Sequence, residues 1–242
     1  MGVISNKVPR GDLKPGDHIY SWRAAHLYSH HGIFVSDEEV IHFTRPATKT
    51  EIVVGKIVSS SKDILSSSSS RPCCSRDHSR INTVVSSCLN CFLNGGNLYR
   101  YEYNVKPAAF LAKTIGGTCT LATSDPPEVV ISRARYLLRD GYGVYKLLKH
   151  NCETFALYCK TELVASKRTG QANSVGGTTW AGFGLACIGL PLVGYCAYSY
   201  GRLMSDICMR KDVDKVPVER LVAEHKDVDK VLVEELVGEH SG

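Results

Sequence analysis

The chain lacks several features that mark other classes of protein. Residues 1–7 contain no apolar run of the kind found in a signal peptide, so we expect a cytoplasmic protein whose ten cysteines are reduced thiols. The formal net charge is only +5 and the basic residues are not interleaved with aromatic ones, so no nucleic-acid partner is expected. Hydrophobic residues make up 43% of the 242 positions, which is enough for a real core and excludes a disordered chain.

Charged residues are also missing between Gly170 and Gly201. An uncharged stretch of this length can cross or lie in a bilayer, and Trp180 and Tyr200 stand toward its ends, where aromatic side chains favour the lipid interface. We therefore expect residues 175–204 to associate with a membrane. The alternative is a glycine-rich apolar element that packs on the rest of the protein.

Alternating residues predict a β-hairpin from strands at 28–35 and 40–44, joined by a polar corner. Side chains alternate between the faces of a strand, so His30 and His31 should point in opposite directions. The hairpin should bring His42 back beside the strand that carries both of them. An imidazole pair across this hairpin is therefore expected.

Serine and cysteine dominate the stretch at about 55–97, which predicts a flexible insertion that contributes nothing to the core. Its cysteines include Cys88 and Cys91, whose C-x-x-C spacing lets two thiolates bind one tetrahedral ion. With Cys73 and Cys74 they form a candidate structural zinc site. The alternative is four free thiols.

A helix is expected to begin at Cys152, because Phe155, Ala156 and Cys159 follow at helical spacing. A thiol in the first turn lies near the positive end of the helix dipole and near N–H groups without helical partners, and both favour the thiolate. Cys152 is therefore a candidate nucleophile. The alternative is a buried, unreactive cysteine.

The C-terminal part contains a tandem repeat of fifteen residues, in which 211–225 are followed by a near copy at 226–240. Two copies are too few for a stacked solenoid, and the mixed charge predicts a solvent-exposed tail. The alternative is a helix that binds a protein partner. We divide the chain into an N-terminal arm (1–12), a catalytic domain (13–162), a linker (163–174), the apolar segment (175–204) and the charged tail (205–242).

A thiol at a helix N-terminus and imidazoles on nearby strands are the components of nucleophilic catalysis. The imidazole removes the thiol proton and later protonates the leaving group, a further polar group fixes the imidazole tautomer, and N–H groups at the helix opening stabilise the oxyanion. This chemistry is acyl transfer.

The same residues resemble the lecithin:retinol acyltransferase domain family over roughly residues 13–162. The matching motifs are Pro15-Gly16-Asp17, Tyr28-Ser29-His30, Val40-Ile41-His42, Tyr145 and Asn151-Cys152-Glu153 with Phe155. The resemblance implies an α+β fold, a circularly permuted papain-like domain with an antiparallel sheet packed against helices. It also implies that His30 is the general base, His42 its orienting partner and Cys152 the nucleophile, with Tyr28 as an oxyanion or positioning group.

The resemblance further implies an enzyme that transfers or hydrolyses acyl chains of glycerophospholipids through an acyl-thioester intermediate, at a membrane and without a cofactor. Two alternatives remain open from the sequence. A cysteine peptidase or isopeptidase would use the same triad, since permuted papain-like folds also serve peptides. A non-catalytic, membrane-tethered scaffold would keep the residues without the reaction.

Overall fold

A computed structural model describes six ranges of the chain: 6–23, 28–44, 83–113, 115–143, 151–165 and 191–226. In chain order its elements are a 3-10 helix η1 (Arg10–Asp12), β1 (His18–Arg23), β2 (Tyr28–Phe34), β3 (Val40–Thr44), β4 (Thr83–Ser87), α1 (Leu89–Leu93), β5 (Tyr99–Arg100), α2 (Pro107–Ala112), α3 (Pro127–Asp140), α4 (Cys152–Thr161), β6 (Leu163–Ala165), α6 (Pro191–Ser205) and β7 (Val213–Lys215). A last helical stretch covers 218–226.

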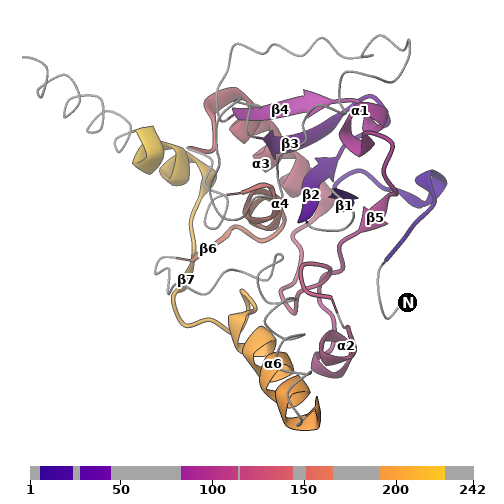
Figure 1. Cartoon of the computed structure of the whole chain (residues 1–242). Coiled ribbons are helices and arrows are strands. Elements are labelled where there is room, and N and C mark those ends of the chain that lie inside the picture. The colour runs from indigo at the N-terminus through magenta and orange to yellow at the C-terminus, as the bar shows by residue number, and fades with distance from the viewer. Residues whose placement is uncertain are drawn as a thin grey trace, which may run out of the picture.

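The centre of the domain is an antiparallel sheet with the strand order β4-β3-β2-β1-β5 (Figure 1). The predicted hairpin is confirmed as β2 and β3, and the α+β class with an antiparallel sheet packed against helices is confirmed as well. β2 lies in the middle of the sheet, and its Ile33 and Phe34 are buried on opposite faces. The helices that cover these two faces decide the environments of His30 and His31.

The two faces of the sheet have separate cores. On one face, Ile33, Ile41 and Phe43 pack against α3 and α4. On the other face, Phe34 and Val40 pack against α1, whose Phe92 is almost fully buried. Alternate residues of β2 thus contribute to different cores, as the two-residue period of a strand requires.

The expectation that the whole of 55–97 lies outside the core is wrong for its last part. β4 pairs with β3 over five residues, and α1 inserts Leu89 and Phe92 into the core beside β3. The serine-rich composition hid a short strand and a helical turn, because each element is only five residues long and contains few apolar residues. Residues 45–82, which hold the serine runs, lie outside the described residues.

α3 and α4 are held together by a buried arginine. Arg133 of α3 donates to the carbonyl oxygen of Cys159 at 2.6 Å and pairs with Asp125 at 3.1 Å and Glu162 at 3.6 Å. A cation at the C-terminal end of α4 also compensates the negative end of that helix's dipole. α3 begins after its N-cap Pro126 and ends before Gly141.

α6 covers the second half of the predicted apolar segment and packs on α2 beyond the sheet (Figure 1). The Tyr195 hydroxyl donates to the carbonyl oxygen of Leu111 at 3.1 Å, and Arg202, which is buried, donates to that of Lys113. Within the described ranges, no helix has both the length and the apolar character needed to span a membrane.

The predicted solvent-exposed tail is partly wrong. β7, in the first repeat unit, pairs with β6, and Leu221 and Val222 are buried in the same core as α4. The sequence pattern did not reveal this, because the apolar residues of the unit alternate with charged ones that remain at the surface.

Candidate active site

The N-terminus of α4 is fixed by a reciprocal capping box. The Asn151 side chain accepts a hydrogen bond from the Thr154 amide at 3.0 Å, and the Thr154 hydroxyl accepts one from the Asn151 amide at 2.9 Å. Such a box satisfies two N–H groups that would otherwise have no helical partner and fixes where the helix begins. It places Cys152 at the first helical position, as predicted.

The Cys152 thiol lies where β2 and β3 separate. Their pairing covers only Ile33 with Ile41 and Phe34 with Val40, while the rest of β3 stays paired with β4. The Cys152 Sγ donates to the carbonyl oxygen of Ser29 at 3.7 Å. Because that carbonyl belongs to the peptide bond leading into His30, the thiol lies next to the backbone of the predicted base.

His30 and His42 meet across the same opening. Nε2 of His30 lies 3.0 Å from Nδ1 of His42, and Nε2 of His42 lies 3.0 Å from the Ser87 hydroxyl. The imidazoles are nearly perpendicular, and the Phe92 ring packs against both, at centroid distances of 5.2 and 5.4 Å. The predicted imidazole pair is present, and Ser87 extends it to a chain of three polar groups.

Gly32 allows this close packing. A Cβ atom there would lie 3.0 Å from the Phe92 ring and 3.1 Å from the Cβ of His42, closer than nearly all real Cβ contacts. Gly32 stands between His30 and Phe34 on the same face of β2. Any larger residue would displace the aromatic ring or the imidazole that it supports.

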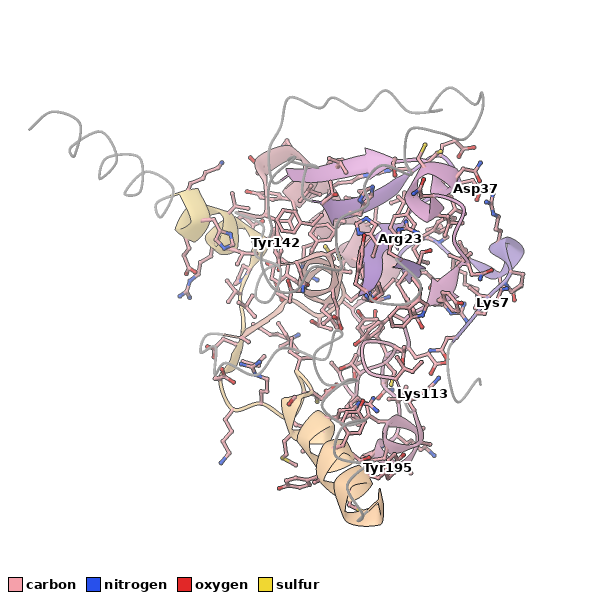
Figure 2. All side chains as sticks on the ribbon, in the orientation of Figure 1. Lys7, Arg23, Asp37, Lys113, Tyr142 and Tyr195 are labelled. Carbon is pink, nitrogen blue, oxygen red and sulfur yellow. The ribbon has the colours of Figure 1, made fainter. Side chains whose placement is uncertain are left out.

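Arg23 is a charged group near the site that the sequence did not single out. Its guanidinium donates to the Ser21 hydroxyl at 2.9 Å and to the carbonyl oxygens of Leu93, at 2.6 Å, and Phe92. Burial lowers the pKa of Arg23, and the neighbouring Tyr28 and Cys152 side chains counteract that shift. Figure 2 shows Arg23 in the middle of the domain, beside the central strands. A cation thus lies within electrostatic range of the thiol.

Tyr28 stands at the start of β2, opposite Arg23 in the strand register, and is 48% exposed.

The candidate zinc ligands lie elsewhere. Cys88 is the N-cap of α1, its sulfur accepting the Cys91 amide at 3.5 Å, whereas Cys73 and Cys74 lie outside the described residues. Among the residues that the structure describes, no three His, Cys, Asp or Glu side chains form a group that could hold a metal ion.

His31 belongs to a different group of polar residues, on the face of β2 away from His30. Its Nδ1 lies 2.8 Å from Nε2 of His18, and its Nε2 lies 2.7 Å from the Ser29 hydroxyl. His18 continues the chain to the Tyr103 hydroxyl at 2.7 Å. Burial lowers the pKa of His31 to about 3 and that of His18 well below its usual value, so both rings are neutral.

Cys159 lies two turns beyond Cys152 in α4 and is fully buried. Burial raises the pKa of its thiol, and burial likewise raises the pKa of Cys119 to about 11. Neither thiol is therefore ionised near neutral pH, and Cys159 is an unreactive residue of the core. The two cysteines of α4 lie in different environments. Cys152 is the first residue of the helix, whereas Cys159 belongs to the core between α4 and the sheet.

Comparison with known proteins now complements this geometry. The family model for Lecithin retinol acyltransferase matches residues 11–165, which include the whole site. The chain belongs to the lecithin retinol acyltransferase family. It is also 45% identical to Protein LEAD-SENSITIVE 1 of Arabidopsis thaliana over 248 residues, covering 91% of this chain and 90% of that protein. No solved structure matches the chain significantly.

Family membership confirms the resemblance seen in the sequence and the papain-like character of the domain. It indicates chemistry of the acyltransferase or phospholipase kind. The family match ends at residue 165, so α6 and the repeat tail lie outside the matched range.

Proposed function

We propose that the protein is a thiol-dependent acyltransferase or phospholipase that acts on the acyl chains of glycerophospholipids through an acyl thioester on Cys152. One observation carries the proposal: the Cys152 thiol, at the capped opening of α4, contacts the peptide bond that precedes His30, and His30 is hydrogen-bonded to His42. These contacts support a site where β2 and β3 part, with Cys152 as its nucleophile, His30 as its base and His42 as the orienting group.

In the first half-reaction, His30 removes the thiol proton and the thiolate attacks the ester carbonyl carbon. Nε2 of His30 faces His42, so proton transfer with the thiol goes through Nδ1. N–H groups at the opening of α4 stabilise the oxyanion, together with the positive end of the helix dipole. The carbon–oxygen ester bond then breaks, His30 returns the proton to the leaving lysolipid oxygen, and an acyl thioester remains.

In the second half-reaction, His30 removes a proton from water, an amine or an alcohol, and this acceptor attacks the thioester. The carbon–sulfur bond breaks, and the thiolate recovers its proton from His30. His42 keeps the base in one orientation throughout, and Ser87 holds the far nitrogen of His42. None of these steps requires a metal ion or an organic cofactor.

We also propose that the enzyme works at a membrane surface. On and just after α6, Tyr195, Tyr200, Met204 and Met209 are between 40% and 64% exposed, a concentration of large apolar side chains on one element. Side chains of this kind favour the boundary between lipid and water. Contact through α6 would supply the domain with lipid from the bilayer.

The test is incubation of the full chain with phosphatidylcholine vesicles, followed by lipid mass spectrometry and intact-protein mass measurement. Wild type should release lysolipid and carry a transient acyl adduct, and Cys152→Ala should lose both, because the proposed thioester forms on the sulfur of Cys152. Cys159→Ala is the matched control from the same helix and should retain both.

Turnover that persists in Cys152→Ala would contradict the proposal. Cleavage of a peptide panel in place of lipid would assign the site to a peptidase, and inertness toward both panels with a folded protein would indicate a scaffold.

The zinc hypothesis is tested separately, by metal analysis of the purified protein and of Cys88→Ser/Cys91→Ser. Stoichiometric zinc that persists in this variant would exclude the pair as ligands.

A further inference from the structure

The first repeat unit, residues 211–225, is docked on the catalytic domain. β7 pairs antiparallel with β6, and the Val216 amide donates to the carbonyl oxygen of Glu162 at 3.1 Å. The Tyr158 hydroxyl of α4 donates to the carbonyl oxygen of Val216 at 2.7 Å. The unit therefore extends a two-stranded sheet and is joined directly to the helix that carries Cys152.

The helical half of the unit completes this contact. Leu221 and Val222 are only 4% and 5% exposed and share a core with α3 and α4. His225 packs on the Tyr142 ring, and a Cβ atom on Gly143 would lie 3.0 Å from its imidazole. In Figure 2, Tyr142 lies beside this helix. We call β6, Tyr142, Gly143, Tyr158 and Glu162 together the docking surface.

The second unit, residues 226–240, repeats every docking side chain. Val213, Val216, Val218, Leu221, Val222 and His225 each recur unchanged fifteen positions later. The two units differ at three positions, where Pro217, Arg220 and Ala223 are replaced by Leu232, Glu235 and Gly238. All three residues of the first unit are exposed. The two units therefore differ only at positions that are exposed to solvent in the docked unit.

Each difference makes the sequence of the second unit less favourable for a helix in the docked position. Pro217 fixes the backbone at the start of the helix and accepts its first hydrogen bond, from the Leu221 amide at 3.0 Å. Arg220 pairs with Glu224 at 2.8 Å one turn away, whereas Glu235 would face Glu239 at the same spacing. Glycine at 238 is a much poorer helix former than alanine.

We propose that residues 226–240 are an interchangeable ligand of the docking surface, and that they bind it in the same chain whenever the first unit leaves. The identical docking side chains give both units the same contacts, while the three exposed differences make the first unit the preferred occupant. The second unit of the same chain is the occupant because a short tether gives it an effective concentration in the millimolar range, far above that of another chain.

The exchange changes the length of the connection between α6 and the docked unit. With the first unit docked, only residues 206–212 separate α6 from β7. With the second unit docked, fifteen more residues join that connection, and an extended chain of this length reaches about 50 Å. The repeat thus offers two lengths for the connection between α6 and the unit on the docking surface.

The test compares thermal unfolding of full-length variants. Leu221→Asp/Val222→Asp disables the first unit, and Leu236→Asp/Val237→Asp is the matched change in the second. The second-unit variant should unfold within about 1 °C of wild type, the first-unit variant about 3 °C lower, and the combined variant about 10 °C lower. A decrease in melting temperature for the combined variant that exceeds the sum of the two separate decreases indicates that the second unit replaces the first. Purely additive shifts, or a first-unit variant as unstable as the combined one, would overturn the proposal.

A rescue experiment tests the three exposed differences directly. In the background of Leu221→Asp/Val222→Asp, the changes Leu232→Pro, Glu235→Arg and Gly238→Ala give the second unit the sequence of the first. The melting temperature should return to the wild-type value, and no recovery would contradict the role given to these positions. Sedimentation of the first-unit variant should show a monomer at all protein concentrations, whereas a concentration-dependent dimer would mean that the second unit docks on a neighbouring chain.

Discussion

Two pairs of histidines lie on opposite faces of β2, and they have different environments although His30 and His31 are neighbours in the chain. His30 and His42 meet at the opening between β2 and β3, against Phe92 and beside the peptide contacted by Cys152. His31 and His18 are fully buried on the other face. The alternation of a single strand thus separates a candidate proton-transfer pair from a structural one.

The difference lies in what each pair can do with a proton. In the buried pair the hydrogen bonds join neutral groups, from Ser29 at one end to Tyr103 at the other, and burial lowers the pKa of both rings. A base must accept a proton near the working pH, which such rings cannot do. His31 and His18 are therefore unsuited to serve as the base, which agrees with the proposal that His30 and His42 carry out the proton transfer.

The largest expected effect comes from removing the proposed base. His30→Gln keeps a polar side chain of similar size but cannot take the thiol proton, so kcat/KM for phosphatidylcholine should fall by about 10³-fold. The melting temperature should stay close to that of wild type. A turnover rate within a few-fold of wild type would assign the base to another residue. It would also contradict the functional difference between the His30–His42 pair and the His31–His18 pair.

Substitution in the buried pair, His31 and His18, should lower stability and leave the reaction rate nearly unchanged. His31→Phe keeps an aromatic ring but leaves Nε2 of His18 and the Ser29 hydroxyl without the partner they have now, so unfolding free energy should fall by about 3 kcal/mol. The rate per folded molecule should change little. Urea unfolding measures the first quantity, and activity normalised to folded protein measures the second. A rate loss as large as that of His30→Gln would mean that both pairs take part in the reaction.

Part of this comparison was predictable from the sequence. The hairpin, the opposite orientation of His30 and His31, the return of His42 and the helix start at Cys152 all follow from local periodicity, which is dictated by the chain itself. Which face would be buried does not follow from it. That depends on α1, a helical turn between serine-rich and glycine-rich stretches, and on Tyr101, which stacks on His18 at 4.4 Å.

The missed members of the site share one cause. Ser87 reaches His42 from β4 and Arg23 reaches the site from the end of β1, and both positions depend on strand pairing between distant parts of the chain. A lone serine in a serine-rich region carries no signal of its own. The docked repeat unit was missed for a similar reason, since its contact with α4 joins residues far apart in sequence.

A smaller effect is expected from acid. His31 has a pKa of about 3 in the folded protein and 6.5 as its reference, so between these values the unfolded chain binds a proton that the folded protein does not. The free energy of unfolding therefore falls as the pH drops below about 6.5, whereas His31 leaves it unchanged at higher pH. At pH 5.5 the loss from this residue is about 1 kcal/mol. His31→Phe should reduce the slope of unfolding free energy against pH by about 1.4 kcal/mol per pH unit in this range. An unchanged slope would contradict the burial assigned to the ring.

The smallest effect tests how far the active pair extends. Ser87→Ala removes the hydroxyl 3.0 Å from Nε2 of His42 while leaving both imidazoles in place, so His42 loses a contact that fixes its orientation. The rate should fall by less than about tenfold, because one neutral hydrogen bond contributes roughly 1 kcal/mol. Ser86→Ala, at the exposed neighbouring position of the same strand, is the matched control and should change nothing. Equal rates for both variants would confine the active pair to His30 and His42, whereas a loss confined to Ser87→Ala makes the hydroxyl its third member.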